Sequence, residues 1–97
     1  MSVTVISKRV FKIQKNDKLI VLLQKLRKHA KKQKGFISRA TFTNINDPID
    51  NIVISEWKTE NDWKKWMEKK EVKKIQGKID TIIGEKTIFD IYKPEKY

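Results

Sequence analysis

The sequence predicts one α+β domain in which four strands and two helical regions follow the order β-α-β-β-α-β. Runs of β-branched and aromatic residues, each of strand length, alternate with segments whose apolar residues recur at three- and four-residue steps. Glycine, proline and asparagine fall between these segments, where turns are needed. The expected architecture is a ferredoxin-like antiparallel four-stranded sheet whose second helical region is split in two.

The first strand and first helix are indicated by a change in apolar spacing. Residues 3–13 are rich in β-branched side chains and contain no glycine or proline, which favours a strand. A helix is expected to start at Asn16 or Asp17, either of which can cap it, and to end before Gly35. Its apolar face consists of residues at helical spacing: Leu19, Leu22, Leu23, Leu26 and Ala30.

The next two strands are expected to form a hairpin. Residues 36–43 and 51–58 have strand composition, and Asn44 to Pro48 supplies turn chemistry between them. The following segment, Thr59 to Asp62, fits a variant of the capping box, in which a threonine hydroxyl binds a backbone N–H one turn ahead. A second helical region therefore begins directly after the hairpin.

This second helical region carries two apolar stripes that do not share one face. Trp63, Trp66 and Met67 lie on one side, and the later stripe is half a turn out of phase with them at about 100° per residue. The later stripe consists of Val72, Ile75, Ile79 and Ile83. The helix is therefore expected to break within residues 69–71, and a fourth strand is expected over residues 86–93, after Gly84.

Both faces of the predicted sheet carry apolar residues. In the first strand Val5 and Phe11 have one parity and Ile6 and Val10 have the other. The third and fourth strands show the same mixture, whereas a sheet with one face in water alternates apolar and polar residues. Two helical regions cover one face, so we expect the other to pack on a second copy of the chain in a dimeric α+β barrel.

Composition limits the classes of function. The 97 residues are expected to form a single domain, residues 1–97, and with no cysteine and one histidine neither a disulfide framework nor a metal site is expected. No apolar run has the length of a membrane span and the start lacks a signal-peptide core, so we expect a cytoplasmic protein without membrane contact. The net charge of +11 comes from lysines spread along the chain, which is typical of a solvated surface.

The chain resembles the antibiotic biosynthesis monooxygenase family. The resemblance covers nearly its whole length: the opening strand, the Lys-Gly-Phe turn at residues 34–36, the Asn-Asp-Pro turn at residues 46–48 and, most specifically, Ser-Glu-Trp-Lys-Thr-Glu-Asn-Asp-Trp at residues 55–63. It implies a dimeric α+β barrel with a small apolar cavity between sheet and helices in each subunit. It also implies oxygenation of a small hydrophobic phenol or quinol without a cofactor, with molecular oxygen as co-substrate.

The resemblance implies that the site residues lie around the helical region after the third strand. Trp66 is the first candidate, because an aromatic residue at this place borders the implied cavity, and Asn61 lies about one turn before it. His29 is the usual type of residue for proton abstraction, and Glu56 and Tyr92 are further candidate bases. The ligand is expected to contact the residues around them: Trp63, Met67, Gln76 and Ile79.

A haem-degrading branch of the family implies a different site. Its members use an asparagine in the first strand, a tryptophan on the helix after the third strand, and a histidine ligand ten residues further. Trp66 matches the tryptophan, but Gln76 stands at the histidine position and Ser7 or Lys8 at the asparagine position. Glutamine is a poor axial ligand for iron, so haem binding and degradation are disfavoured.

Two other classes share the same order of elements. RNA-recognition domains do so, but Asn51 to Lys58, NIVISEWK, lacks their aromatic base-stacking signature, so no specific nucleic acid is expected. A non-catalytic dimer that binds a small hydrophobic ligand or regulates another protein remains open, because the residues supply no pairing of a base with a partner.

Overall fold

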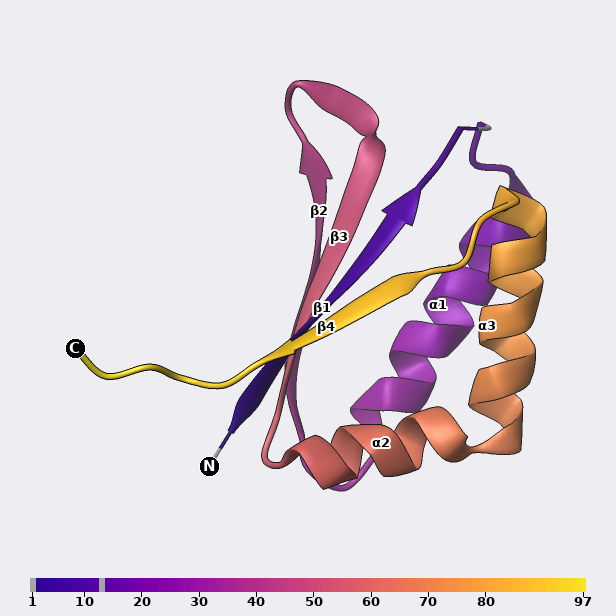
Figure 1. The fold of residues 1–97 in the computed structure, drawn as a ribbon. Helices are drawn as coiled ribbons and strands as arrows, with labels where there is room; N and C mark the ends of the chain where they lie inside the picture. The colour runs from indigo at the N-terminus through magenta and orange to yellow at the C-terminus, as the bar shows by residue number, and fades with distance from the viewer. Residues whose placement is uncertain (1, 13) are drawn as a thin grey trace.

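The computed structural model describes residues 2–12 and 14–97 and has the predicted order of elements. These are β1 (Val3–Val10), α1 (Asp17–Lys31), β2 (Phe36–Asn44), β3 (Asp47–Trp57), α2 (Glu60–Glu68), α3 (Lys70–Ile83) and β4 (Ile88–Tyr92). The strands form an antiparallel sheet in the order β2-β3-β1-β4, which confirms the ferredoxin-like α+β prediction. Figure 1 shows the three helices gathered on one side of this sheet.

The helix boundaries follow the predicted capping residues. Asn16 caps α1 by accepting a 2.9 Å hydrogen bond from the backbone N–H of Leu19, and Thr59 caps α2. The predicted break falls at Lys69, whose extended backbone (φ −64°, ψ 136°) separates α2 from α3. The chain then leaves α3 through Gly84 at φ 84°, a left-handed conformation that glycine adopts without steric cost.

The strand boundaries differ from the predictions. β1 ends at Val10, and the end predicted for it, Ile13, lies outside the described residues. β3 begins four residues earlier than predicted because Asn44 pairs with Asp47 across a turn of two residues. Pro48 is tolerated in this strand because it lies at a register irregularity of the β2–β3 ladder, where no N–H donor is required. β4 is shorter at both ends than predicted.

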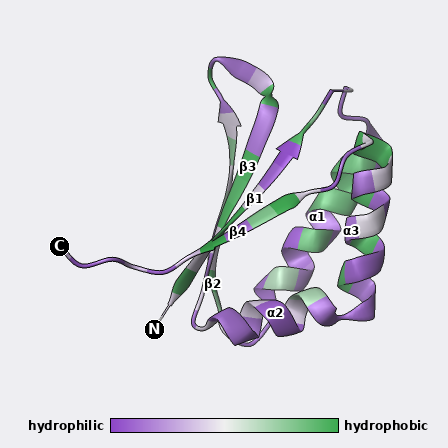
Figure 2. Cartoon of the chain, viewed as in Figure 1, coloured by the Kyte–Doolittle hydropathy of each residue, from purple (hydrophilic) through white to green (hydrophobic). Residues whose placement is uncertain are grey.

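The sheet presents two different faces. The face under the helices bears Val5 and Trp57, both fully buried, and they pack with the apolar stripes of all three helices. The opposite face, which we call the open face, carries residues that no helix covers: Ile6, Phe42, Ile52, Ile54, Ile88 and Tyr92. Apolar residues therefore line both faces, as predicted, and Figure 2 shows hydrophobic positions along the strands as well as at intervals along α1 and α3.

Replacement of each of the three glycines by alanine should change the free energy of unfolding differently. At Gly35 (φ 86°) a methyl group would overlap the Asp62 side chain, so Gly35→Ala should lower the free energy of unfolding by about 2 kcal/mol. Gly84 has the same conformation in open space, so its replacement should cost about 1 kcal/mol. Gly77 lies within α3 with open space around it, and Gly77→Ala should stabilise by about 0.5–1 kcal/mol. Urea denaturation measures all three, and equal losses at Gly35 and Gly84 would contradict the contact with Asp62.

Candidate functional site

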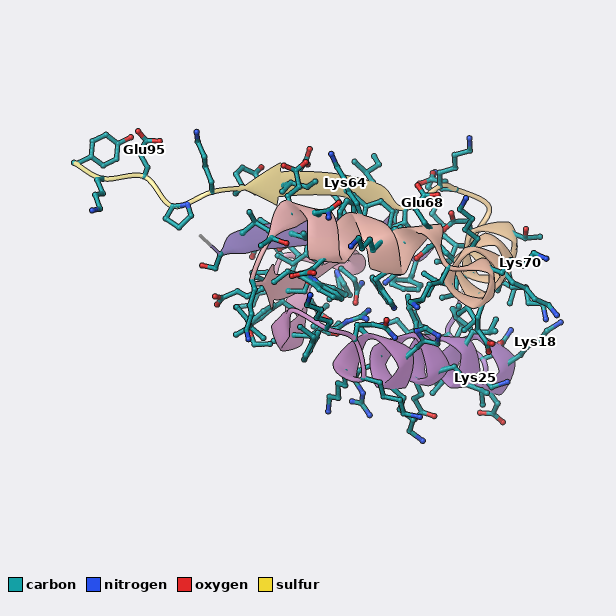
Figure 3. The ribbon with its side chains drawn as sticks, turned by 90° about the horizontal axis from the view of Figure 1, so that it is seen from below. Lys18, Lys25, Lys64, Glu68, Lys70 and Glu95 are labelled. Atoms are coloured by element: carbon teal, nitrogen blue, oxygen red, sulfur yellow. The ribbon has the colours of Figure 1, made fainter. Side chains whose placement is uncertain are left out.

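Three tryptophans form an aromatic cluster between the end of β3 and α2. Trp57 and Trp66 stack with ring centroids 5.3 Å apart and planes 30° from parallel, and Trp63 lies 5.7 Å from the ring of Phe89. All three indoles are at most 9% exposed. Lysines occupy the outer surface of the helices, as Figure 3 shows for Lys18 and Lys25 of α1. The cluster therefore forms an inner wall of the space between the sheet and the helices.

His29 of α1 is tied to this cluster. Its Nδ1 accepts a 3.1 Å hydrogen bond from the indole Nε1 of Trp66, which can only donate. The amide nitrogen of Gln33 lies 3.3 Å from the same His29 atom and also donates to the His29 carbonyl oxygen at 3.0 Å. The Nδ1 lone pair is therefore engaged, and in neutral His29 the proton resides on Nε2. His29 therefore uses Nδ1, the atom that could otherwise accept a proton from a substrate, to orient Trp66.

The space beside the tryptophans is narrow. Its volume is about 10 Å³, roughly that of one water molecule, and its walls include Trp57, Trp63, Trp66 and Gln76. The stacked indoles and the polar residues across from them fill most of the region in which the resemblance implies a cavity. We call this small space the narrow cavity.

A buried polar network closes the far side of the narrow cavity. The guanidinium of Arg9 on β1, 4% exposed, donates to Gln76 Oε1 at 3.0 Å and to Thr87 Oγ1 at 3.1 Å. Gln76 Nε2 in turn donates to Thr87 Oγ1 at 2.7 Å and to Asp80 Oδ1 at 2.9 Å. Asp80 Oδ1 also accepts from the Thr87 hydroxyl at 2.7 Å. Every side-chain atom of Gln76 that can hydrogen-bond has a partner, so its amide holds Arg9 in place.

Burial dominates the electrostatics of Arg9. Removal from water lowers the pKa of Arg9 to about 10, and the negative charge of Asp80 opposes this shift. At neutral pH the guanidinium stays protonated, so a positive charge is fixed at the centre of the helix-covered sheet face.

A larger pocket of about 150 Å³ lies between α1 and strands β1, β2 and β3. Its charged walls are Arg9, Lys15, Arg27 and Arg39. Its remaining walls are Phe11, Ile20, Leu23, Gln24, Thr41, Asn51 and Val53. We call it the basic pocket, because among the described residues that line it four are cations and none is a carboxylate.

Arg39 is the unusual member of the basic pocket. It lies on β2 opposite Ser55, which places it on the same sheet face as Arg9. Burial is the main cause that lowers the pKa of Arg39 to about 10, and the neighbouring charges of Arg9 and Arg27 contribute to the same shift. Within residues 2–12 and 14–97, no hydrogen bond or ion pair involves its guanidinium. A half-buried cation thus faces other cations with no partner to balance it.

The sequence-predicted residues are distributed unevenly around these two spaces. Trp63, Trp66 and Gln76 line the narrow cavity together, and His29 binds Trp66 from outside it. Met67 packs on the core, Ile79 is fully buried within it, and Asn61 is exposed on α2; none of these three lines either space.

Two candidate bases lie elsewhere. Glu56 and Tyr92 pair with open-face neighbours: Glu56 lies opposite Thr4 and Ser38, and Tyr92 lies opposite Thr4. Their parity therefore turns both away from the helix-covered face, so neither reaches the site.

Sequence reasoning missed Arg9, Arg39 and Asn51. A signal was present, because the chain has only three arginines among 23 basic residues, and Arg9 has the parity of Val5 and Phe11 on the core side of the first strand. A charged residue at a core parity indicates a functional or paired group. Gln76, in contrast, was expected to contact a ligand and is held within the protein.

The residues of the site do not fit a haem group. Gln76 Oε1 accepts from Arg9 and Nδ1 of His29 accepts from Trp66, so both atoms are engaged within the protein rather than directed at an iron. The basic pocket, at about 150 Å³, is also smaller than the roughly 300 Å³ at which pockets for larger ligands begin. In the described part of the chain, no three side chains of histidine, cysteine, aspartate or glutamate gather to hold a metal ion. Among the same residues, no helix is long and apolar enough to cross a bilayer.

The unpaired charge of Arg39 predicts a gain in stability on its removal. Its pKa is lowered to about 10, so its burial is unfavourable below about pH 10 and becomes less so as the pH rises further. Arg39→Met should therefore raise the free energy of unfolding by about 1 kcal/mol near pH 7. Chemical denaturation measures it, with the exposed Lys28→Met as a control expected within about 0.5 kcal/mol of the parent. A loss of stability in Arg39→Met would mean that a group within the protein balances its charge.

Known structures share this fold. A conserved protein from Methanosarcina mazei superposes with a TM-score of 0.86 at 20% identity, covering 97% of this chain and 93% of the other. SnoaB of Streptomyces nogalater, described as a cofactor-independent oxygenase, superposes with a TM-score of 0.82 at 7% identity, covering 99% and 95%. Rv0793 of Mycobacterium tuberculosis gives 0.83 at 9% identity, covering 100% and 98%. At these identities the likeness shows the fold alone.

Sequence comparison identifies the family. No curated protein matches the chain. The profile of the family described as antibiotic biosynthesis monooxygenase, however, matches residues 1–78. Because this match covers most of the chain and the fold agrees with it, the protein belongs to the antibiotic biosynthesis monooxygenase family.

Proposed function

We propose that the protein is a cofactor-independent monooxygenase that oxidises a small hydrophobic phenol or quinol within the subunit. Family membership supports oxygenase chemistry, and one feature of the site carries the assignment: the basic pocket adjoins the narrow cavity. Arg9, Arg39 and Val53 line both spaces, so the two spaces are neighbours. The substrate ring occupies the basic pocket, and dioxygen lies at its boundary with the narrow cavity, on the side of Trp66.

The positive pocket supplies what such a reaction needs. Cations around the pocket favour the ionised form of a bound phenol, and ionisation makes the ring a better electron donor. One electron passes from the phenolate to dioxygen, and the resulting superoxide combines with the ring radical. Protonation gives a hydroperoxide, and loss of water leaves a second carbonyl on the ring. The phenol is oxidised by two electron pairs in all, one oxygen atom enters the quinone product and the other leaves as water.

The named residues have distinct roles in this proposal. Trp66 borders the reacting molecules and is the catalytic residue, whereas His29 is a positioning residue that fixes the indole through its Nδ1. Proton removal needs no dedicated protein base, because the field of Arg9 and Lys15 lowers the pKa of the bound phenol enough for water to accept the proton. No role is assigned to Asn61, which is exposed.

One observation favours a second function, ligand binding without turnover. The only histidine accepts a hydrogen bond at Nδ1, and Gln76 is committed to Arg9, so the site has few groups free to react. A dimer that binds a small aromatic ligand or regulates another protein would need no more than this. Oxygen consumption separates the two functions.

Oxygen uptake with a panel of hydroquinones, naphthols and haem tests the proposal. We expect sustained uptake with at least one phenol or quinol, at least about 10-fold slower in Trp66→Phe, because Phe leaves a gap in the narrow cavity and releases His29. Lys65→Met, at an exposed position of the same helix, should behave as the parent. Saturable binding of the panel with no oxygen uptake would instead support the non-catalytic function.

We further propose that the protein is a homodimer joined through the open face. The face presents Ile6, Ile52 and Ile54 at its centre, with Phe42 (49% exposed) and Ile88 (59% exposed) on the flanking strands. An exposed group of apolar side chains of this size is unusual on a soluble monomer. A second sheet packed on it would bury both surfaces around a two-fold axis.

Sedimentation tests this dimer. The parent protein should sediment as a dimer at micromolar concentration, and Ile54→Asp should sediment as a folded monomer because a carboxylate at the centre of the face would be buried without a partner. Val21→Asp places the same charge at an exposed apolar position of α1 and should leave the dimer intact. A monomeric parent protein would refute the assignment of the open face.

A further inference from the structure

We propose that the basic pocket binds an oxyanion, a carboxylate or a phosphate, carried by a small aromatic ligand, and that Arg39 is its principal contact. As a statement about the substrate this inference rests on the proposed function and narrows it to phenols or quinols that bear an anionic group. As a statement about binding it can be measured without turnover.

The distribution of arginine is the first argument. The chain has 23 basic residues, of which three are arginines, and all three line this one pocket. A general surplus of positive charge does not require arginine, and here lysine provides it on the outer surface. The planar guanidinium differs from an ammonium group because it presents a fork of N–H donors that matches a carboxylate or phosphate and keeps its charge when buried. The placement of arginine therefore indicates oxyanion recognition.

The hydrogen bonding of the pocket leaves its half-buried guanidinium free for a ligand. Arg9 is held by Gln76 and Thr87. The Asn51 amide is held by Lys15, which donates to its oxygen at 3.2 Å, and by the Pro48 carbonyl oxygen, which accepts from its nitrogen at 3.2 Å. Arg39 alone among the buried or half-buried cations has no bond within the described residues. Its five N–H donors lack an acceptor.

The charge balance calls for a negative group at the same place. No carboxylate is found among the described residues that line the pocket, and Asp80 lies behind Arg9, separated from it by Gln76 and Thr87. Arg9 and Arg27 repel Arg39, and burial together with this repulsion lowers the pKa of Arg39. A bound anion would relieve the repulsion and supply the missing acceptor.

The remaining walls define the other part of the ligand. Phe11, Ile20, Leu23 and Val53 are apolar, and Lys15 lies 4.6 Å from the ring centre of Phe11. A volume of about 150 Å³ accommodates one benzene-sized ring. The pocket thus fits a single aromatic ring with an oxyanion substituent directed at Arg39.

A titration with three matched compounds tests this inference. Benzoate, phenyl phosphate and phenol are added separately to the full chain at neutral pH, and amide chemical shifts are followed by NMR. We expect at least one anion to bind about 10- to 100-fold more tightly than phenol, with shifts centred on Phe11, Arg39 and Val53. The tighter of the two anions identifies the headgroup as carboxylate or phosphate.

Variants show whether the preference belongs to Arg39. Arg39→Met should abolish the preference for the anion, and Arg39→Lys, which keeps the charge without the fork, should retain part of it. Lys28→Met removes one charge from the exposed surface of α1 and should retain all of it. Equal weakening in Arg39→Met and Lys28→Met, equal binding of phenol and the anions, or no saturable binding of either anion would overturn the inference.

The outcome is separable from that of the proposed function. Tight anion binding without oxygen uptake from any phenol or quinol, anionic or uncharged, would leave the oxyanion site standing and remove the oxygenase. Rapid oxygen uptake from an uncharged naphthol, with no preference for anions, would leave the oxygenase standing and remove the oxyanion site.

Discussion

The burial of Arg9 is the constraint on which the interior of this protein depends. A guanidinium under the helices is strongly unfavourable unless its donors are satisfied, and the protein satisfies them with Gln76 of α3 and Thr87 before β4. Asp80 completes the set by binding both of these partners. The network joins β1 to the end of α3 and to the start of β4, so the segment after the last helix is positioned by a charge on the first strand.

This arrangement divides the space between sheet and helices into two unlike halves. On one side of Arg9 the tryptophans stack and leave room for little more than one small molecule. On the other side the pocket is larger, partly apolar and surrounded by cations. Because Arg9 and Arg39 line both halves, these charged residues form the boundary between them. An oxygenase that relies on its substrate for electrons needs little more from its protein than this shape and field.

The unbalanced charge of Arg39 has a consequence for stability as well as for binding. Protein interiors rarely retain a charge with no partner, and residues of a binding site are often less favourable for folding than their replacements would be. Within the lysine-rich chain, the position of Arg39 is better explained by a ligand than by the fold. The apolar residues of the open face are likewise better explained by a contact outside the subunit than by the fold. Ile6, Phe42 and Ile54 contribute little to the core beneath the helices.

The sequence by itself determined the order of elements, the caps at Asn16 and Thr59, the helix break near Lys69 and the apolar residues of both sheet faces, because each depends on neighbours within a few positions. It also indicated Trp66 as an interior residue. Only the tertiary structure decided where the pocket lies and what lines it. Arg9, Arg27 and Arg39 are far apart along the chain. Strand register, which pairs Arg9 with Asn51 and Arg39 with Ser55, brings the two strand arginines to one sheet face, and α1 carries Arg27 to the same pocket. No local pattern encodes that meeting, because it depends on pairings between distant strands.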